Sequence, residues 1–98
     1  MAVLFVLEGT VKSDKVDDFK NFAKTSAAST KAEKGCAWVK AAVDPASRYV
    51  LIVQNWESED DAANFLIKQQ GKPEVKAAIE AMMEPGTFKR RELTPYGN

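Results

Sequence analysis

The residues best suited to chemistry lie at the end of an apolar stretch, 49–56, that finishes with Gln54, Asn55 and Trp56. Successive side chains of a strand point to opposite faces of its sheet, so Gln54 and Trp56 share one side and Asn55 the other. A tryptophan ring offers a flat apolar surface and one N–H donor. We predict that Gln54 and Trp56 line the floor of a pocket and that Asn55 faces a subunit interface. The alternative is that Trp56 seals the core and that both amides make ordinary strand-end hydrogen bonds.

A second pair of candidates is Trp38 and Lys40, which share one face of a predicted strand over 36–43. A lysine beside a tryptophan on a buried strand is suited to hold an anionic substrate oxygen, so we place both in the predicted pocket. The alternative is that Lys40 extends along the ring to solvent. Glu8 is a candidate proton acceptor if burial raises the pKa of its carboxyl. Its alternative is an ion pair with Lys40, Arg90 or Arg91.

The composition excludes several kinds of catalytic site. The chain has no histidine, which removes Ser-His-Asp and Cys-His chemistry and almost every zinc site. It also lacks a glycine-rich dinucleotide turn. We therefore expect a protein that binds no haem, flavin or metal cofactor.

The bulk properties also limit the partners. The 98 residues suit one domain, and the formal net charge is zero without a basic stripe, which disfavours nucleic-acid binding. No apolar run is long enough to span a bilayer, and the N-terminus lacks the features of a signal peptide. A single cysteine, Cys36, fits a reducing compartment. We expect a cytoplasmic protein that binds neither nucleic acid nor membrane.

The elements that must position the candidate residues follow the order β-α-β-β-α-β. Ser13 and Ser58 are candidate N-caps of two helical regions, and Gly71-Lys72-Pro73 interrupts the second region before it resumes over 74–83. The predicted strands cover 3–11, 36–43, 49–56 and 87–93. This order is the ferredoxin-like motif, an α+β fold with one antiparallel sheet and its helices on one face. We assign residues 1–98 to this single domain.

The strands 3–7 and 50–53 are apolar on both faces, although such a sheet normally leaves its second face in water. The chain has no spare element that would cover this face. A second copy of the chain is the simplest cover. We therefore predict a homodimer joined through the outer faces of two sheets, which pair into a dimeric α/β barrel.

Almost the whole chain resembles the antibiotic-biosynthesis-monooxygenase domain of the dimeric α/β-barrel superfamily, a group that includes quinol monooxygenases. The best local signature is Trp56-Glu57-Ser58-Glu59 after an apolar strand, followed by a helical region of this length and a short last strand. The resemblance implies two ferredoxin-like subunits packed sheet to sheet, with a pocket between sheet and helices. It also implies oxidation of electron-rich phenols or quinols by molecular oxygen without metal, flavin or haem.

The same resemblance adds residues to the predicted pocket. It places Trp56 at a pocket tryptophan, Ile52 at a pocket asparagine, Lys76 at a pocket arginine and Phe65 at a histidine early in the second helical region. The full predicted pocket is Trp56, Gln54, Ile52, Phe65, Lys76, Trp38 and Lys40. The leading functional prediction is a cofactor-independent monooxygenase acting on a small hydrophobic aromatic. The alternative is a non-catalytic dimeric protein that binds a small apolar ligand or serves a stress-related role.

Overall fold

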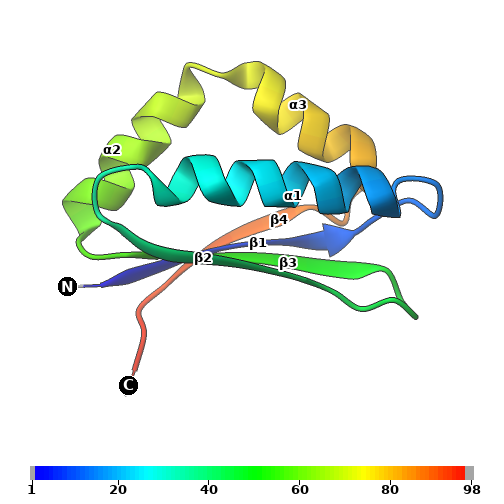
Figure 1. Cartoon of the computed structure of the whole chain (residues 1–98), viewed down its shortest axis with the longest axis horizontal. Coiled ribbons are helices and arrows are strands. Elements are labelled where there is room, and N and C mark those ends of the chain that lie inside the picture. The colour runs from blue at the N-terminus through cyan, green and yellow to red at the C-terminus, as the bar shows by residue number, and fades with distance from the viewer. Residues whose placement is uncertain (1, 97–98) are drawn as a thin grey trace.

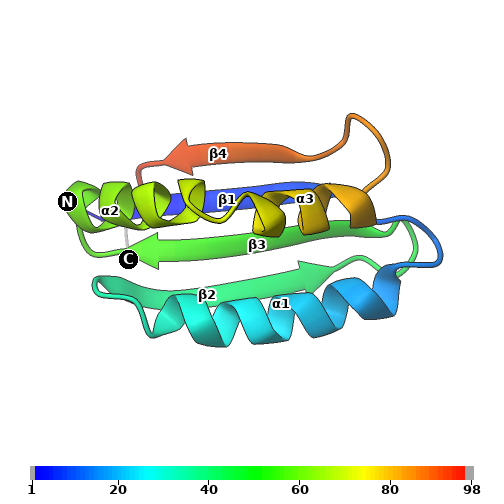
Figure 2. The same cartoon turned by 90° about the horizontal axis from the view of Figure 1, so that it is seen from above.

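The computed structural model describes residues 2–96, which form one four-stranded antiparallel sheet with three helices on one face (Figure 1). The strand order across the sheet is β2-β3-β1-β4. Seen from above, α1 lies over the β2 side, and α2 and α3 follow one another over the middle of the sheet (Figure 2). The elements are β1 (Val3–Thr10), α1 (Val16–Lys31), β2 (Cys36–Val43), β3 (Tyr49–Trp56), α2 (Glu59–Gln70), α3 (Pro73–Met82) and β4 (Lys89–Leu93). This architecture confirms the predicted α+β ferredoxin-like fold.

The two predicted N-caps have different outcomes. Ser58 is extended and its side chain accepts a hydrogen bond of 3.1 Å from the Asp61 N–H, so it caps α2 as predicted. The prediction for Ser13 is wrong, because α1 begins three residues later at Val16. The Lys15 N–H instead donates to the Lys12 carbonyl at 2.9 Å. This hydrogen bond closes a turn in which Ser13 takes part before the helix starts.

The predicted break of the second helical region is confirmed, with α3 beginning at Pro73 rather than one residue later. Proline suits the first helical position because its missing N–H has no helical partner there. The last strand begins at Lys89 and not at the predicted Thr87. The Thr87 hydroxyl donates to the Glu84 carbonyl at 2.8 Å and accepts from the Thr10 N–H at 3.1 Å, which holds Thr87 in the preceding turn.

The core lies between the inner face of the sheet and the helices, and it forms two clusters. One cluster gathers around Phe19, Val50 and Ile52 near α1 and α3, and the other gathers around Phe5 and Trp56 under α2. Figure 1 shows why they are separate: α2 and α3 meet at an apex held away from the sheet. No helix in the described residues is long and apolar enough to cross a membrane.

Candidate functional site

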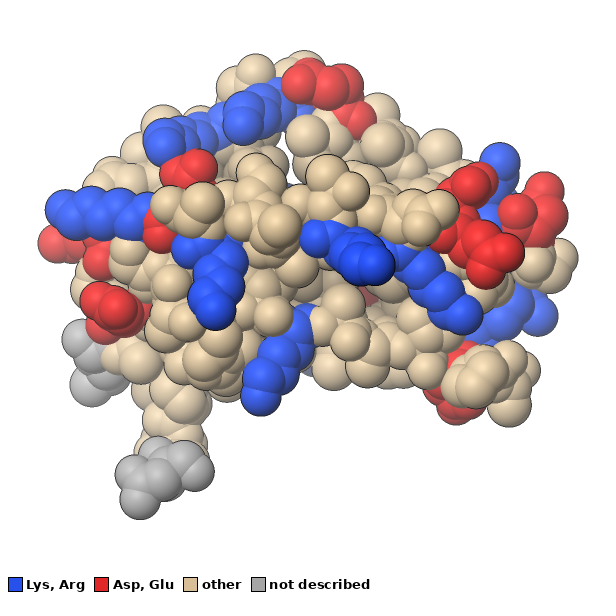
Figure 3. Space-filling view, in the orientation of Figure 1, with Lys and Arg blue, Asp and Glu red and all other residues tan. Residues whose placement is uncertain are grey.

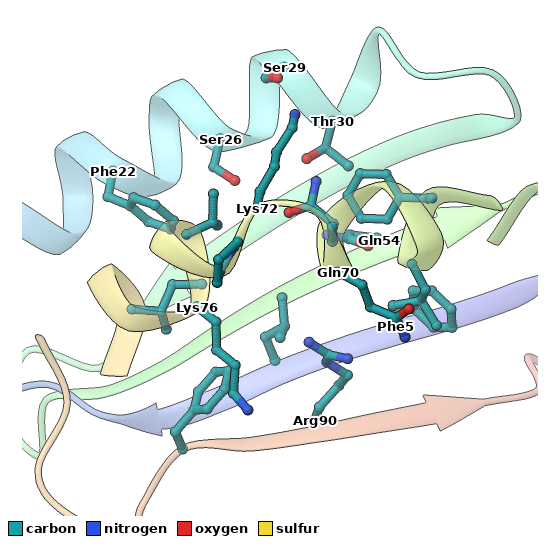
Figure 4. Close-up of a pocket in the computed structure, with 18 of the residues that line it drawn as sticks. Phe5, Phe22, Ser26, Ser29, Thr30, Gln54, Gln70, Lys72, Lys76 and Arg90 are labelled. Carbon is teal, nitrogen blue, oxygen red and sulfur yellow. The ribbon is translucent and has the colours of Figure 1, made fainter. Parts of the chain in front are cut away.

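A cavity of about 610 Å³ lies between the inner face of the sheet and the helices (Figure 4). Phe5 and Phe65 from one core cluster and Ile79 from the other belong to its lining. The cavity therefore occupies the space that the two clusters leave between them. Its volume is in the range of small-molecule sites, which are mostly apolar with a few placed polar groups.

Gln54 is the polar side chain that the fold holds most firmly in this cavity. It is 6% exposed, and the Trp56 Nε1–H donates to its Oε1 at 3.1 Å. An indole N–H can only donate, so the amide oxygen must be the atom that faces Trp56. The two N–H donors of the amide are then free for a ligand in the cavity that Gln54 lines. Of the two amides at the end of β3, Gln54 is the one that lines the cavity.

Trp56 lies behind the cavity wall instead of lining it. The indole is fully buried, with its centroid 4.7 Å from that of Phe65 and 6.4 Å from that of Phe5. Trp56 is not among the residues that line the cavity. The alternative given above, a tryptophan that seals the core, describes its packing. Its further role is to orient Gln54 through the hydrogen bond between them.

Trp38 and Lys40 lie on the opposite face of the sheet, which corrects their predicted place in the pocket. The register shifts between Cys36, which pairs with Trp56, and Trp38, which pairs with Asn55. Without this bulge Trp38 would pair with Gln54 and face the cavity; a one-residue insertion reverses the face. On the outer face the Lys40 Nζ lies 5.0 Å from the centroid of the Trp38 ring.

The remaining predicted residues divide between cavity and core. Phe65 and Lys76 line the cavity. Ile52 shares the inner face of β3 with Gln54, but it packs into the core cluster beside α1 and is not among the lining residues. Ile52 is only two positions from Gln54 along β3, yet it packs in the core and Gln54 lines the cavity.

Arg90 and a row of hydroxyl groups on α1 also belong to the cavity lining, although they were not predicted from the sequence. Phe22, Ser26, Ser29 and Thr30 line the cavity from one face of α1. Ser26, Ser29 and Thr30 follow Phe22 by four, seven and eight residues, a spacing that places them on the same face of the helix. The face of α1 that is apolar at Phe22 therefore becomes polar toward its C-terminal end. Arg90 belongs to a run of three basic residues that is typical of an edge strand. Its pairing with Leu7 of β1 places it on the inner face.

The ionisable groups outside the cavity make no catalytic site. Glu8 accepts a hydrogen bond from Arg91 Nε at 3.0 Å on the outer face, so the predicted ion pair is confirmed and Glu8 is not a base for the cavity. Burial raises the pKa of the Cys36 thiol, with Lys31 partly opposing the effect. The thiol is therefore protonated near neutral pH and a poor nucleophile. The described residues contain no group of three or more His, Cys, Asp or Glu placed to hold a metal ion.

The residues that line the cavity include no Asp, Glu, Cys or Tyr. The chain itself has no histidine. The ionisable side chains of the lining are Lys72, Lys76 and Arg90, all of them cationic. The site can bind an aromatic body, donate hydrogen bonds to its oxygen atoms and favour its anionic form. It offers no carboxylate or imidazole as a general base.

Comparison with known proteins finds the same fold in solved structures. No known protein family and no curated protein matches the chain by sequence. A variant of SnoaB, a cofactor-independent oxygenase from Streptomyces nogalater, superposes with a TM-score of 0.82 and 18% identity, over 99% of this chain and 95% of that one. A conserved protein from Methanosarcina mazei Go1 superposes with a TM-score of 0.79 and 18% identity, over 95% of this chain and 91% of that one. An antibiotic biosynthesis monooxygenase superposes with a TM-score of 0.76 and 10% identity, over 97% of this chain and 99% of that one.

These identities are low, so the likeness concerns the fold. The match extends over nearly the whole length of both chains in each comparison. It therefore includes the sheet and all three helices. The chain therefore has the fold of these solved structures, among them proteins named as antibiotic biosynthesis monooxygenases.

Proposed function

We propose that this protein binds a small hydrophobic aromatic, such as a quinol or phenol, in the cavity and oxidises it with molecular oxygen without a cofactor. The observation that carries the proposal is the Gln54 amide, oriented by the Trp56 N–H at 3.1 Å and placed on the cavity wall. Its N–H donors suit a phenolic or quinone oxygen. The rings of Phe5 and Phe65 line the same cavity and suit the aromatic body.

The proposed chemistry uses electrons from the substrate. Three cations in the lining favour a phenolate over a phenol, and a phenolate is the more electron-rich species. A phenol with hydrogen on its para carbon would react with one O₂. One oxygen atom would enter the ring to give a quinone, and the other would leave as water with two hydrogens of the substrate. The protein would bind and orient the substrate and would exclude water from the cavity.

The second candidate is a non-catalytic protein that binds the same class of ligand. It is favoured by the lining itself, which contains no carboxylate, thiol or phenol to accept a proton. Both functions use the same cavity and differ only in whether the bound aromatic reacts.

The test is oxygen uptake and product analysis with a panel of phenols and hydroquinones under ¹⁸O₂. We expect a quinone that carries one ¹⁸O atom from an oxidised phenol, and a loss of turnover in Gln54→Leu. Lys24→Ala is the matched control, because Lys24 is exposed on α1 and does not line the cavity. Binding without oxygen uptake in any member of the panel would refute the monooxygenase function and leave the ligand-binding candidate.

We also propose the homodimer through the outer sheet faces. That face carries Val6, which is 7% exposed, and the half-buried Leu51 and Val53. The Asn55 Oδ1 is buried there without a hydrogen-bond partner among the described residues. A donor from a second copy would satisfy it. Val53→Asp should give a monomer by analytical ultracentrifugation at a concentration where the parent protein is a dimer, and a monomeric parent protein would refute the dimer.

A further inference from the structure

We infer that the cavity selects ligands that carry a carboxylate, which Arg90 and Lys76 hold at the exposed end while Gln54 contacts the opposite end of the ligand. The inference rests on the proposed function, since it concerns the same cavity, and it specifies the chemical class of what enters. The ligand would combine an aromatic body with one acidic group.

The charges of the cavity are one-sided, although the charges of the chain are balanced. The chain has 14 basic and 14 acidic residues, and the face in Figure 3 shows both signs interspersed. Lys72, Lys76 and Arg90 line the cavity without any Asp or Glu. They come from three places in the fold, the α2–α3 connection, α3 and β4. The positive sign of the cavity is therefore a property of its tertiary structure.

Two of these cations extend into the cavity from different walls. In Figure 4, Arg90 rises from β4 toward the helices, and Lys76 extends from α3 toward β4. A guanidinium binds a carboxylate through two parallel N–H donors, and an ammonium adds a further charge-assisted bond. The pair is thus arranged to receive one carboxylate group from two sides.

Neither cation is strongly neutralised by the protein. No carboxylate of the described residues forms an ion pair with Arg90, whereas its neighbour Arg91 pairs with Glu8 at 3.0 Å on the other face. Lys76 pairs with Glu80 at 3.7 Å, with the side chains 66% and 52% exposed. An exposed pair of this kind contributes little and is readily exchanged for a better partner.

The positive end of a helix adds to the same field. α3 has ten residues and begins at Pro73, which lines the cavity beside Lys72. The N-terminus of a helix carries a partial positive charge. This contribution has the same sign as the three cationic side chains of the lining.

The polarity of the cavity also orients the ligand. Gln54 is 6% exposed and offers neutral N–H donors, whereas Arg90 is exposed to solvent. Phe5, Leu7 and Ile79 line the cavity as well. A phenolic or carbonyl oxygen suits Gln54, the aromatic body suits the apolar wall, and the carboxylate stays near solvent, where it keeps part of its hydration.

The test compares two ligands of nearly the same shape, anthracene-2-carboxylic acid and anthracene-2-carboxamide. Their affinities for the full chain are measured near neutral pH by anthracene fluorescence. The acid is ionised there and the amide is neutral. We expect the acid to bind at least about tenfold more tightly, as charge-assisted hydrogen bonds predict. Added salt should lower the affinity for the acid and leave the affinity for the amide unchanged.

The variants locate the effect. Arg90→Gln should remove most of the preference for the acid, because it weakens binding of the acid far more than binding of the amide, and Lys76→Gln should remove part of the preference. Arg91→Gln is the matched control, on the same strand but the opposite face, and should keep the preference. Melting temperatures confirm that each variant is folded; if Arg90→Gln does not fold, Lys76→Gln and the salt dependence still decide.

The outcomes separate this inference from the proposed function. Equal affinity for acid and amide, or equal losses in Arg90→Gln and Arg91→Gln, would overturn the carboxylate preference while the cavity remains a ligand site. Failure of both ligands to bind would overturn the inference and the proposed ligand cavity together. Selective binding of the acid without oxygen uptake in the phenol assay would support the inference and refute only the monooxygenase function.

Discussion

Trp56→Phe tests whether the tryptophan acts on a ligand through Gln54 or by contact. The substitution removes the indole N–H and leaves a phenyl ring for the stack with Phe65. Without its donor the buried Gln54 Oε1 loses a hydrogen bond of 3.1 Å, and an unsatisfied buried group of this kind costs about 1–3 kcal/mol. The smaller ring adds a packing loss below the roughly 3–5 kcal/mol expected for Trp→Ala.

The free energy of unfolding should therefore fall by about 2 kcal/mol or more, which lowers the melting temperature of a domain of this size by roughly 8–16 °C. Ligand affinity should also fall, because the Gln54 amide is no longer oriented and can turn its oxygen into the cavity. The assay is a double-mutant cycle with Gln54→Leu, read out by thermal unfolding and by ligand titration.

The cycle gives a clear refutation. If Trp56 acts through Gln54, Trp56→Phe should weaken ligand binding in the parent protein and have no further effect on it in the Gln54→Leu background. Additive losses in ligand affinity would show that Trp56 contacts the ligand itself. A full ligand response in Trp56→Phe with a large loss of stability would show that the hydrogen bond has no role in the site. All variants are compared at one protein concentration, because unfolding of a dimer depends on it.

Three further predictions concern the frame of the site. Ser58→Ala should lower the free energy of unfolding by about 1 kcal/mol through loss of the α2 cap, whereas Ser13→Ala should have almost no effect in the same denaturant titration. Gly35→Ala should destabilise much more than Gly86→Ala, because both have positive φ but only at Gly35 would a Cβ collide with another side chain, that of Asp61; equal melting temperatures would contradict this. Cys36 should react with iodoacetamide more slowly near neutral pH than a free thiol, and because its pKa is raised in the folded state, its contribution to stability is full below the pKa of the unfolded thiol and is lost as pH rises through the folded pKa.

Local chemistry was enough to predict most of the fold. Each correctly predicted feature depends on residues that are close together in the sequence. These features are the apolar runs of β1 and β3, the cap at Ser58 and the break at Gly71-Lys72-Pro73. β2 and β3 begin and end where the sequence predicts. The missed start of α1 has the same origin: the turn closed at Lys15 competes locally with a helix begun at Ser13, and propensity alone does not decide between them.

The site depends on relations that only the tertiary structure decides. Alternation along a strand tells which residues share a face, but the register tells which face that is, and one extra residue after Cys36 turns Trp38 away from the cavity. The same rule separates Arg90 from Arg91, since only their pairing with β1 decides which of them faces the cavity.

The sequence by itself determined that Gln54 and Trp56 share a side of one strand. Only the packing of the rings of Phe5 and Phe65 decided that the indole is buried and the amide is the group that faces the cavity. The physical reason is that alternation orders side chains along one strand, whereas burial depends on the helices that pack above it. Residues at the junction of α2 and α3 line the cavity together with Gln54, whereas Ala62 and Phe65 of α2 pack in the core with Trp56.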